Sequence, residues 1–337
     1  MGWTRVGRKG GFRYYDARGR RIVDPAKLER IERLAIPPAW QDVTISPRAS
    51  AKLQATGRDR AGRKQYLYHA DFRAAQEQAK YDRLIRFAEK LPELRAAMAE
   101  HLDKDELDRE RVSAIALRLI NLGWFRVGSE RYARESGTYG ITTLTKRHVT
   151  VRGNRIALAF RSKQRIQVRT TLVDAELAAA MRELLAVKGS RVFEYDWEGS
   201  LYNLTSRRLN EYVKLYLGEE FTAKDFRTWG GTLLAAIAFA ERARRHGFPE
   251  TPTDEKRSVT AVMRRVAEQL GNTPTVCRAS YVSPAVVEQY LGGRTLEDFR
   301  PRHLRVVGAR LTELEPEEQA LLSLLRSWRI RETRAAA

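Results

Sequence analysis

The sequence predicts an α+β protein with a small strand-rich N-terminal domain and a larger, mainly α-helical domain that carries a three-stranded β insertion. Three observations support this. Short strand-like runs separated by turns fill the first 70 residues. From Asp71 the apolar residues recur at helical spacing, and strand-like runs between residues 148 and 170 interrupt that pattern. We expect the boundary to lie within the first long helix, which gives domains at 1–80 and 81–337.

The N-terminal domain is predicted from alternating runs and turn residues. Its elements are, in order, a hairpin of residues 12–16 and 20–24, a short helix opened by Pro25, a strand at 43–46, and a hairpin of residues 52–56 and 64–69.

The larger domain begins with helices at residues 70–90 and 111–122. The β insertion follows as the runs HVTV, RIALAF and RIQVR, with Gly153-Asn154 suited to its first turn. Everything after Asp174 is predicted to be helical. The expected N-caps are Asp174, Thr205 or Ser206, and Asp254.

Charge gives the first indication of a partner. Lys and Arg total 62 against 42 acidic residues, a formal net charge of +20. About half of that excess lies in residues 1–65. Such a field attracts polyanions, and nucleic acid is the commonest of these. The alternative is a charged surface that only keeps the protein soluble, although solubility needs a smaller net charge.

Several classes of protein are excluded by residues that are missing. No glycines are spaced G-x-G and no Gly-Lys pair exists, so the dinucleotide and P-loop fingerprints are absent. The five histidines are scattered, and the single cysteine, Cys277, cannot form a zinc finger or an intramolecular disulfide. The longest apolar run, residues 233–240, is too short to span a membrane. We therefore expect no cofactor, no metal, no membrane partner and a reducing cytoplasm.

Cleaving a phosphodiester without a metal requires a nucleophile, fixed positive charge for the anionic transition state, and an acid for the leaving oxygen. Arg and Lys supply that charge when no divalent ion does. The chain offers Arg126, Lys163, Arg227 and Tyr281 as candidates. Taken singly each is weak evidence, because most arginines in so basic a chain are solvated and 13 tyrosines are available.

Together these residues lie in three blocks that resemble a known family. The blocks are FRVGSERYARESGTYGITTL, KDFRTWGGT and GNTPTVCRASYV. They resemble the signature blocks of type IB DNA topoisomerases of the poxvirus and bacterial kind, in the family's order. RKQYLYH resembles part of that family's small DNA-clamping domain, and the resemblance spans roughly residues 10–300. It implies the fold shared by tyrosine recombinases and type IB topoisomerases, with the larger domain as the catalytic one.

The resemblance also implies a catalytic role for each candidate. Tyr281 would be the nucleophile, forming a 3′-phosphotyrosyl link and releasing a 5′-hydroxyl. Arg126 and Arg227 would hold the non-bridging phosphate oxygens, for which a planar guanidinium is suited. Lys163, in a turn of the β insertion, would protonate the leaving 5′-oxygen, because an ordinary lysine carries its proton at neutral pH.

One position departs from the family pattern. Asn272 stands where the poxvirus enzymes and most recombinases have His. An amide donates a hydrogen bond but carries no proton near neutral pH. The role implied for Asn272 is therefore stabilisation of the oxyanion.

Further DNA contacts follow from the same resemblance. Gln65, Tyr66 and Tyr68 match a strand that the family lays in the major groove, and Tyr66 and Tyr68 share one strand face. The alternative is that the two tyrosines pack the small domain's own core. Arg131, Tyr132 and Lys224 match positions that contact the DNA backbone near the cleavage site, whereas Cys277 is expected to be a packed, inert thiol.

The resemblance implies relaxation of supercoiled DNA without ATP or metal, by transient single-strand cleavage, strand rotation and religation. The expected partner is double-stranded DNA, clamped by a monomer in the bacterial nucleoid. A tyrosine recombinase is the nearest alternative, but its second arginine usually lies in His-x-x-Arg, whereas here Lys224 occupies the first position. A non-enzymatic architectural protein would fit the charge but not the three blocks.

Overall fold

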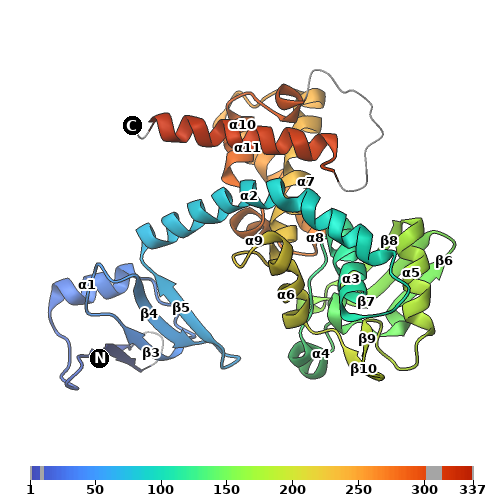
Figure 1. Ribbon diagram of the computed structural model, residues 1–337. Coiled ribbons are helices and arrows are strands. Elements are labelled where there is room, and N and C mark those ends of the chain that lie inside the picture. The colour runs from blue at the N-terminus through green and yellow to red at the C-terminus, as the bar shows by residue number, and fades with distance from the viewer. Residues whose placement is uncertain (1, 8–10, 301–312, 336–337) are drawn as a thin grey trace. The chain divides into compact units, whose positions relative to one another are not determined.

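The computed structural model describes residues 2–7, 11–300 and 313–335. By its internal contacts the chain divides into two compact units, Met1–Tyr81 and Asp82–Ala337. A strand sheet dominates the first unit and helices dominate the second, which also contains a three-stranded sheet (Figure 1). The predicted α+β class is confirmed.

The N-terminal unit is built on a five-stranded antiparallel sheet of order β2-β1-β3-β4-β5. Its strands are β1 (Trp3–Val6), β2 (Arg13–Tyr15), β3 (Gln41–Ile45), β4 (Leu53–Arg58) and β5 (Lys64–Tyr68). The predicted hairpin around the basic loop is confirmed as β4 and β5.

The first predicted hairpin of this unit is wrong in its second strand. Residues 20–24 form no strand, and only Arg21 bridges to Tyr15. The turn itself is real, because the Asp16 carboxylate accepts the N–H groups of Arg18 and Arg20 at 2.8 and 3.0 Å. Strand β2 pairs instead with β1, whose four residues carried no clear strand signal.

Helix α1 (Pro25–Arg33) supplies the apolar cover of this sheet. It begins at Pro25, as predicted, and the carboxylate of Asp24 accepts the N–H of Ala26 at 3.0 Å. Ile31 of α1 and Ile45 of β3 are among the buried residues of the small core. On β5, Leu67 packs against this core, so its strand neighbours point to the opposite face.

Helix α2 (Ala70–Leu102) contains the division between the two units, which falls between Tyr81 and Asp82. Its second half is amphipathic. Buried residues recur at three- and four-residue spacing at Leu84, Phe87, Ala88, Leu91, Leu94 and Met98. This stripe anchors α2 to the core of the larger unit.

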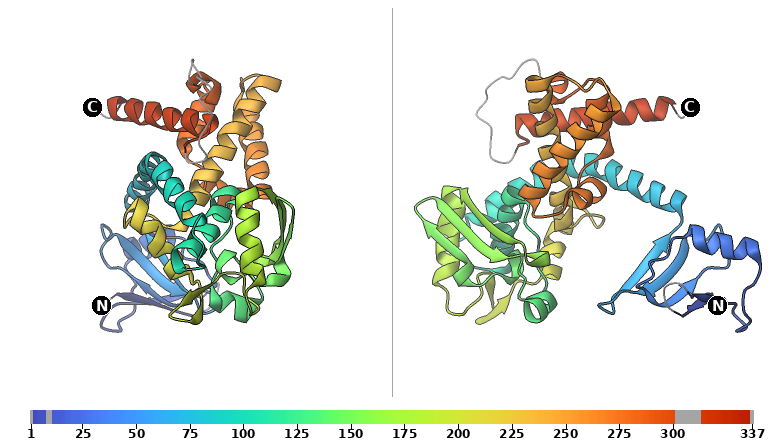
Figure 2. Two further views of the ribbon diagram at one scale, coloured as in Figure 1. Left: turned by 45° about the vertical axis from the view of Figure 1, so that its right-hand side comes forward. Right: turned by 180° about the vertical axis from the view of Figure 1, so that it is seen from behind.

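The larger unit is mainly helical. Its helices are α3 (Arg109–Gly123), α4 (Glu130–Ser136), α5 (Ala175–Ala186), α6 (Ser206–Leu217), α7 (Ala223–His246), α8 (Pro252–Leu270), α9 (Pro274–Ser280), α10 (Pro284–Leu291) and α11 (Pro316–Ala335). Short 3₁₀ turns lie at Ile141–Thr143, Lys146–His148, Lys163–Arg165 and Leu296–Phe299. Helices α3 and α7 run through the core, since most of their residues are buried (Figure 2). None of the helices in the described ranges is long and apolar enough to cross a membrane.

The predicted β insertion is confirmed as an antiparallel sheet of order β6-β7-β8. Its strands are β6 (Val149–Arg152), β7 (Arg155–Arg161) and β8 (Gln167–Val173). Strand β7 alternates strictly, with Ile156, Leu158 and Phe160 buried and the residues between them exposed. Helix α5 contacts this sheet, so the sheet has one covered face.

Two expectations for the region after Asp174 are wrong. Residues in this region also form a β-hairpin, β9 (Glu194–Trp197) and β10 (Ser200–Asn203), which is too short and polar to show a clear period. Helix α8 is capped by Thr251, whose hydroxyl accepts the N–H of Asp254, so Asp254 lies in the first turn. The caps at Asp174 and Thr205 are confirmed.

Candidate active site

Helix α7 brings Arg227 into the larger unit's core. Its first turn is fixed by a capping box, in which Asp225 accepts the N–H and hydroxyl of Thr222 at 2.9 and 3.1 Å. Arg83 of α2 pairs with the same carboxylate at 2.8 Å. Arg227 therefore follows a rigid helix start, and its side chain enters a buried position with 4% of its surface exposed.

The Arg227 guanidinium is held by two backbone carbonyls. It donates to Trp124 O and, at 2.8 Å, to Leu270 O. Its Nε is buried and has no hydrogen-bond partner in the part of the chain that the structure describes. Burial lowers the pKa of Arg227, and the nearby Tyr281 partly offsets that effect. Burying a cation that lacks a carboxylate partner costs free energy, and binding of an anionic ligand would reduce that cost.

Arg126 occupies a matching position on the opposite side of the site. It follows α3, which ends where Trp124 takes a left-handed backbone with φ 50°. Its guanidinium donates to the Ser162 hydroxyl at 3.1 Å and to Gly271 O at 2.9 Å. Burial, together with the positive charge of Arg227, lowers the pKa of Arg126 to about 10, which leaves it charged at neutral pH.

The turn between α8 and α9 supplies Asn272. Gly271 ends α8 with φ 58°, and the N–H of Asn272 donates to Ala267 O at 2.9 Å. The side-chain oxygen of Asn272 accepts a hydrogen bond from Arg126. Its Nδ2 is buried, and its only neighbour among the described residues that could accept a hydrogen bond is the Cys277 thiol, so at least one of its two N–H groups is unused.

Tyr281 ends the short helix α9. Two glycines of the KDFRTWGGT block let other segments approach α7 closely, Gly231 at Tyr281 and Gly230 at Trp124. A Cβ on Gly231 would lie 2.7 Å from the Tyr281 carbonyl oxygen, and one on Gly230 would lie 2.3 Å from the Trp124 ring. Thr232 adds a hydroxyl that donates to Tyr281 O at 3.2 Å and accepts the N–H of Ser283 at 3.1 Å. The tyrosine is thereby fixed against the helix that carries Arg227.

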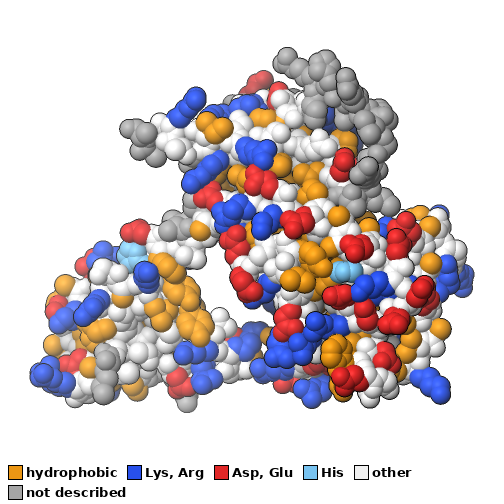
Figure 3. Space-filling model, viewed as in Figure 1, with side chains coloured by type: hydrophobic (Ala, Val, Ile, Leu, Met, Phe, Trp, Pro, Cys, Tyr) orange, Lys and Arg blue, Asp and Glu red, His pale blue; other side chains and the backbone are white. Residues whose placement is uncertain are grey.

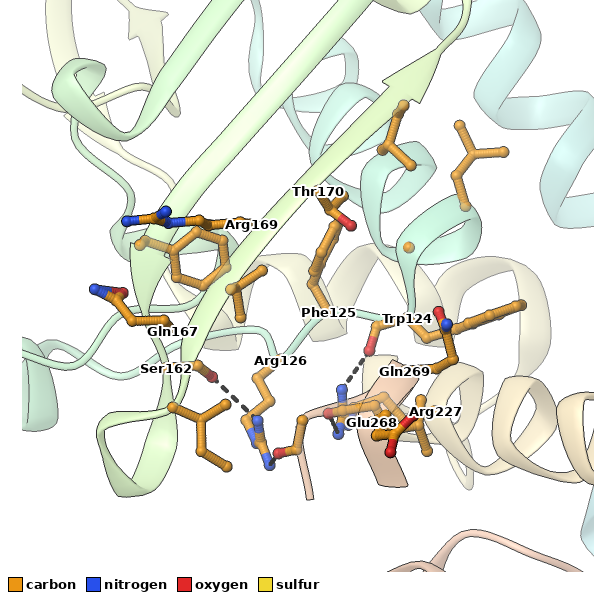
Figure 4. A pocket seen from close by; sticks show the side chains of 18 residues that line it. Trp124, Phe125, Arg126, Ser162, Gln167, Arg169, Thr170, Arg227, Glu268 and Gln269 are labelled. Atoms are coloured by element: carbon orange, nitrogen blue, oxygen red, sulfur yellow. Dashed lines mark hydrogen bonds between the residues drawn. The ribbon is translucent and has the colours of Figure 1, made fainter. Parts of the chain in front are cut away.

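The two arginines also line a cavity of about 390 Å³. Its walls come from the end of α3, the strands around Ser162, and the end of α8, with the arginines at its floor (Figure 4). No acidic side chain forms an ion pair with either arginine within the described residues. The exposed Glu268 also lines this cavity but pairs with neither arginine, and two like charges that lack an ion-paired carboxylate form a site for an anion.

Lys163 lies in the turn between β7 and β8, close to this site in the fold. The turn is tight, with Ser162 N donating to Ile166 O at 2.8 Å and with left-handed backbones at Gln164 and Arg165. Ser162 contacts Arg126, so the turn does reach the site. The Lys163 side chain is exposed, and within the described residues no hydrogen bond joins it to Tyr281.

The remaining backbone-contact candidates in this unit are exposed. Arg131 pairs with Glu135 at 2.9 Å on α4, and Tyr132 of the same helix is 44% exposed. Lys224 is exposed at the start of α7, three residues before Arg227. Cys277, in contrast, is fully buried and burial raises the pKa of its thiol, in keeping with an inert residue.

The N-terminal unit carries its own candidate surface. Tyr66 and Tyr68 of β5 are 49% and 38% exposed and stack with 6.2 Å between ring centroids, so they do not pack the core. Lys64 lies over the Tyr66 ring at 5.6 Å, and Gln65 donates to Asp59 at 2.9 Å. Apolar surface gathers along the β4–β5 side of this unit (Figure 3). Exposed aromatics beside cations suit contact with nucleic acid.

The sequence does not predict several of the residues that hold the site. They are Trp124 and Leu270 with their carbonyl groups, Ser162, and the Gly230-Gly231-Thr232 run. Only the glycine pair gave a signal, because adjacent glycines inside a helix cost stability and so indicate close approach by another segment.

Comparisons with known proteins give matches to DNA topoisomerases over both units of the chain. The family model for the eukaryotic DNA topoisomerase I catalytic core matches residues 69–292, and that for the bacterial DNA topoisomerase IB N-terminal domain matches residues 11–59. DNA topoisomerase 1B of Acanthamoeba polyphaga mimivirus is 32% identical over 83% of this chain and 84% of its own length. DNA topoisomerase 1B of Vaccinia virus is 22% identical over 79% and 82%, respectively.

A solved structure of the XerH site-specific recombinase bound to its difH substrate covers 56% of this chain and 48% of its own. Its TM-score of 0.32 and 16% identity are too low to bear on the fold or the function. The family is shown by the match to the catalytic core, the match to the N-terminal domain and the 32% identity to the mimivirus protein. The chain belongs to the type IB DNA topoisomerases, which are isomerases that relax DNA. The recombinase and architectural alternatives are set aside.

Proposed function

We propose that this chain relaxes supercoiled double-stranded DNA with Tyr281 as the nucleophile and without ATP or a metal ion. The observation that carries the assignment is the buried Arg227 together with the partly buried Arg126, neither paired with a carboxylate among the described residues, beside Tyr281. Arg126 and Arg227 present positive charge where a phosphate would gain negative charge in the transition state.

The proposed reaction exchanges one phosphodiester for another. Tyr281 Oη attacks phosphorus, the bond from phosphorus to the 5′-oxygen breaks, and the phenolic proton passes to solvent. Lys163 gives a proton to the 5′-oxygen, which leaves as a hydroxyl. Arg126 and Arg227 hold the non-bridging oxygens, and the spare amide donor of Asn272 adds a hydrogen bond to one of them. Religation is the reverse reaction, so no nucleotide is needed.

The rest of the reaction is strand rotation, driven by torsional strain while the 3′-phosphotyrosyl link holds one end. We infer that the N-terminal unit contributes Gln65, Tyr66 and Tyr68 to a clamp on the duplex. Arg131, Tyr132 and Lys224 would contact the backbone near the cleavage site. A monomer is sufficient for this, and the match to a bacterial N-terminal domain supports action in the nucleoid.

The test combines plasmid relaxation with capture of the covalent intermediate. Purified protein should relax supercoils of either sign and, when denatured during the reaction, should remain attached to one DNA strand. Tyr281→Phe should do neither and should bind DNA with unchanged affinity, because only a hydroxyl is lost. Adduct formation by Tyr281→Phe would assign the nucleophile elsewhere. Relaxation without any adduct would exclude the mechanism.

A further inference from the structure

Helix α11 lies beyond the family match, because the catalytic-core model ends at residue 292. It is nevertheless part of the larger unit's core, where Leu321, Leu324 and Leu325 are buried. The helix contacts both α7 and α10, and the three helices lie together in Figure 1. Helix α7 carries Arg227, and α10 begins shortly after Tyr281.

The first directed contact of α11 is made by Glu318, which has 4% of its surface exposed. Its carboxylate accepts the indole N–H of Trp229 at 2.9 Å, and both its oxygens accept Arg95 at 2.8 Å. Trp229 lies two residues after Arg227 in α7. The rotation of α7 about its axis is therefore fixed by α11 on one side, while the Arg227 guanidinium is held by Leu270 O on another.

The second directed contact is at the other end of α11. The indole N–H of Trp328 donates to Glu288 Oε2 at 2.6 Å, and Arg331 donates to the side-chain oxygen of Gln289. Glu288 and Gln289 lie in α10, which begins three residues after Tyr281. One helix thus bonds to the element that carries Arg227 and to the element that follows the nucleophile.

We propose that α11 is a brace that aligns Tyr281 with Arg227, and that Glu318 and Trp328 are positioning residues for the cleavage step. The proposal rests on the function assigned above. Tyr281 and Arg227 belong to segments far apart in the sequence, so their alignment depends on how α7 and α10 are held. Apolar packing is non-directional, whereas hydrogen bonds from two indole N–H groups fix register and rotation.

Stability alone does not account for Glu318. Burying a carboxylate costs free energy unless it is fully hydrogen-bonded, and a buried ion pair often adds no net stability over an apolar residue. The apolar face of α11 already supplies attraction to the core. The carboxylate accepts four hydrogen bonds, two from Arg95, one from Trp229 and one from the N–H of Glu315. All four form together in only one arrangement of α11 against α7 and α2, so Glu318 fixes that arrangement.

Two conservative variants test the brace. Trp229→Phe and Trp328→Phe each keep an aromatic ring and remove the N–H that bonds to a carboxylate. We expect each to slow single-turnover cleavage at saturating DNA by about 10- to 100-fold, as expected for misplacement of reacting groups by a fraction of an ångström. Non-covalent affinity, measured with Tyr281→Phe also present, should stay within about twofold.

The matched control is Arg326→Gln. Arg326 lies on the same helix, is 52% exposed and pairs with Glu89 of α2 at 2.6 Å, with no bond to α7 or α10. Its cleavage rate should equal that of the unmodified protein. All rates are measured at a temperature at which circular dichroism shows every variant to be fully folded, so that lost stability does not enter the comparison.

The outcomes distinguish a failure of the proposed function from a failure of the α11 brace. Unmodified protein that forms no covalent adduct would overturn the proposed function. If unmodified protein forms the adduct but both indole variants cleave at its rate, α11 is only a stabilising element and the brace is wrong, whatever their melting temperatures. The brace would also be wrong if both indole variants bound DNA more weakly but kept the cleavage rate of the unmodified protein at saturating DNA.

Discussion

The guanidinium of Arg227 lies over the ring of Tyr281, with 5.0 Å between Cζ and the ring centroid. Both groups reach this contact because Gly231, on α7, has no side chain. The contact places the proposed nucleophile beside a buried cation before any substrate is present. It supplies the preorganised charge on which electrostatic catalysis depends.

Replacement of Gly231 with alanine should disrupt this contact. The new Cβ would lie 2.7 Å from Tyr281 O and 3.1 Å from Leu270 Cδ1, so backbone must move. We expect single-turnover cleavage to fall by about 10- to 100-fold and stability by about 1–3 kcal/mol, the usual cost of overpacking. Gly11→Ala, at an open position, is the control and should change neither quantity. A normal cleavage rate in Gly231→Ala would show that the approach of α7 to Tyr281 is not needed.

The unpaired arginines should bind simple oxyanions in the absence of DNA. Binding to the folded state alone raises its stability by RT ln(1 + [L]/Kd), or about 2.7 kcal/mol at a hundredfold excess over Kd. Phosphate should therefore raise the melting temperature. Vanadate should raise it more, because it adopts the five-coordinate geometry of the transition state.

Variants of the two arginines check where the oxyanion binds. Arg126→Ala and Arg227→Ala should each lose most of the vanadate-dependent shift. Arg207→Ala removes an exposed cation, 77% exposed, and should keep the shift. An equal shift in all three variants would place the anion elsewhere on this basic protein.

Much of the fold was predictable because its signals are local. The β4–β5 hairpin, the alternation in β7 and the caps at Asp174 and Thr205 each follow from a few neighbouring residues. The β9–β10 hairpin was missed because its eight strand residues are mostly exposed and show no buried face. At α8, Thr251 followed by proline forms the cap, whereas the sequence pattern predicts a cap at Asp254, because both residue types are common N-caps.

The site was predictable only in part, for a related reason. Family-like blocks indicated Arg126, Arg227 and Tyr281, but no short-range pattern indicates which backbone carbonyls hold a guanidinium. Arg227 donates to carbonyls 103 and 43 residues away, and Trp229 donates to Glu318, 89 residues away. Such contacts are set by packing of whole helices, which composition and periodicity do not specify.

Glu318 should make stability depend on pH in the acid range. Burial alone would raise the pKa of its carboxyl, but the bonds from Arg95, Trp229 and the Glu315 N–H outweigh it and lower the pKa. A group with a depressed folded-state pKa adds stability above its unfolded pKa, about 4.3 for Glu. That stability is lost as the pH falls from this value through the lower folded-state pKa.

Melting curves measured from neutral pH down to acid pH check this expectation. Glu318→Gln should be less stable than the unmodified protein at neutral pH, by about 3–5 kcal/mol if Arg95 is left unpaired. The difference should shrink as the pH falls below the ordinary Glu range. Glu219→Gln, at an 89% exposed carboxylate, is the control and should stay parallel to the unmodified protein. A Glu318→Gln difference that stays constant with pH would contradict the expected linkage.

Chelation should not slow the reaction, because Arg126 and Arg227 supply the positive charge that a metal provides elsewhere. Single-turnover cleavage in EDTA, without nucleotide, should match cleavage in Mg²⁺ at equal ionic strength. The ionic-strength match is needed because Mg²⁺ also screens protein–DNA attraction. A strict Mg²⁺ requirement in this measurement would count against the whole proposed mechanism.

Lys163 offers a test of the acid in the reaction. If it protonates the leaving 5′-oxygen, Lys163→Ala should slow cleavage by about 10²–10⁴-fold, the usual effect of removing a positioned general acid. A substrate with sulfur in place of the bridging 5′-oxygen leaves as a thiolate, which needs no proton. Cleavage of that substrate should be nearly as fast in Lys163→Ala as in unmodified protein.

Two comparisons make the Lys163 result specific. Arg126→Ala and Arg227→Ala lose charge at the non-bridging oxygens, so sulfur should not restore their rates to the same extent. If Lys163 is instead an exposed turn residue that contacts a distant phosphate, its loss should weaken binding and reduce the salt dependence by about one charge. It should then slow the oxygen and sulfur substrates alike. Equal slowing would remove Lys163 from the acid role. Tyr281 and the two arginines would keep theirs, because their assignment rests on the contact of Arg227 with Tyr281 and on the placement of Arg126 beside Ser162 and Gly271.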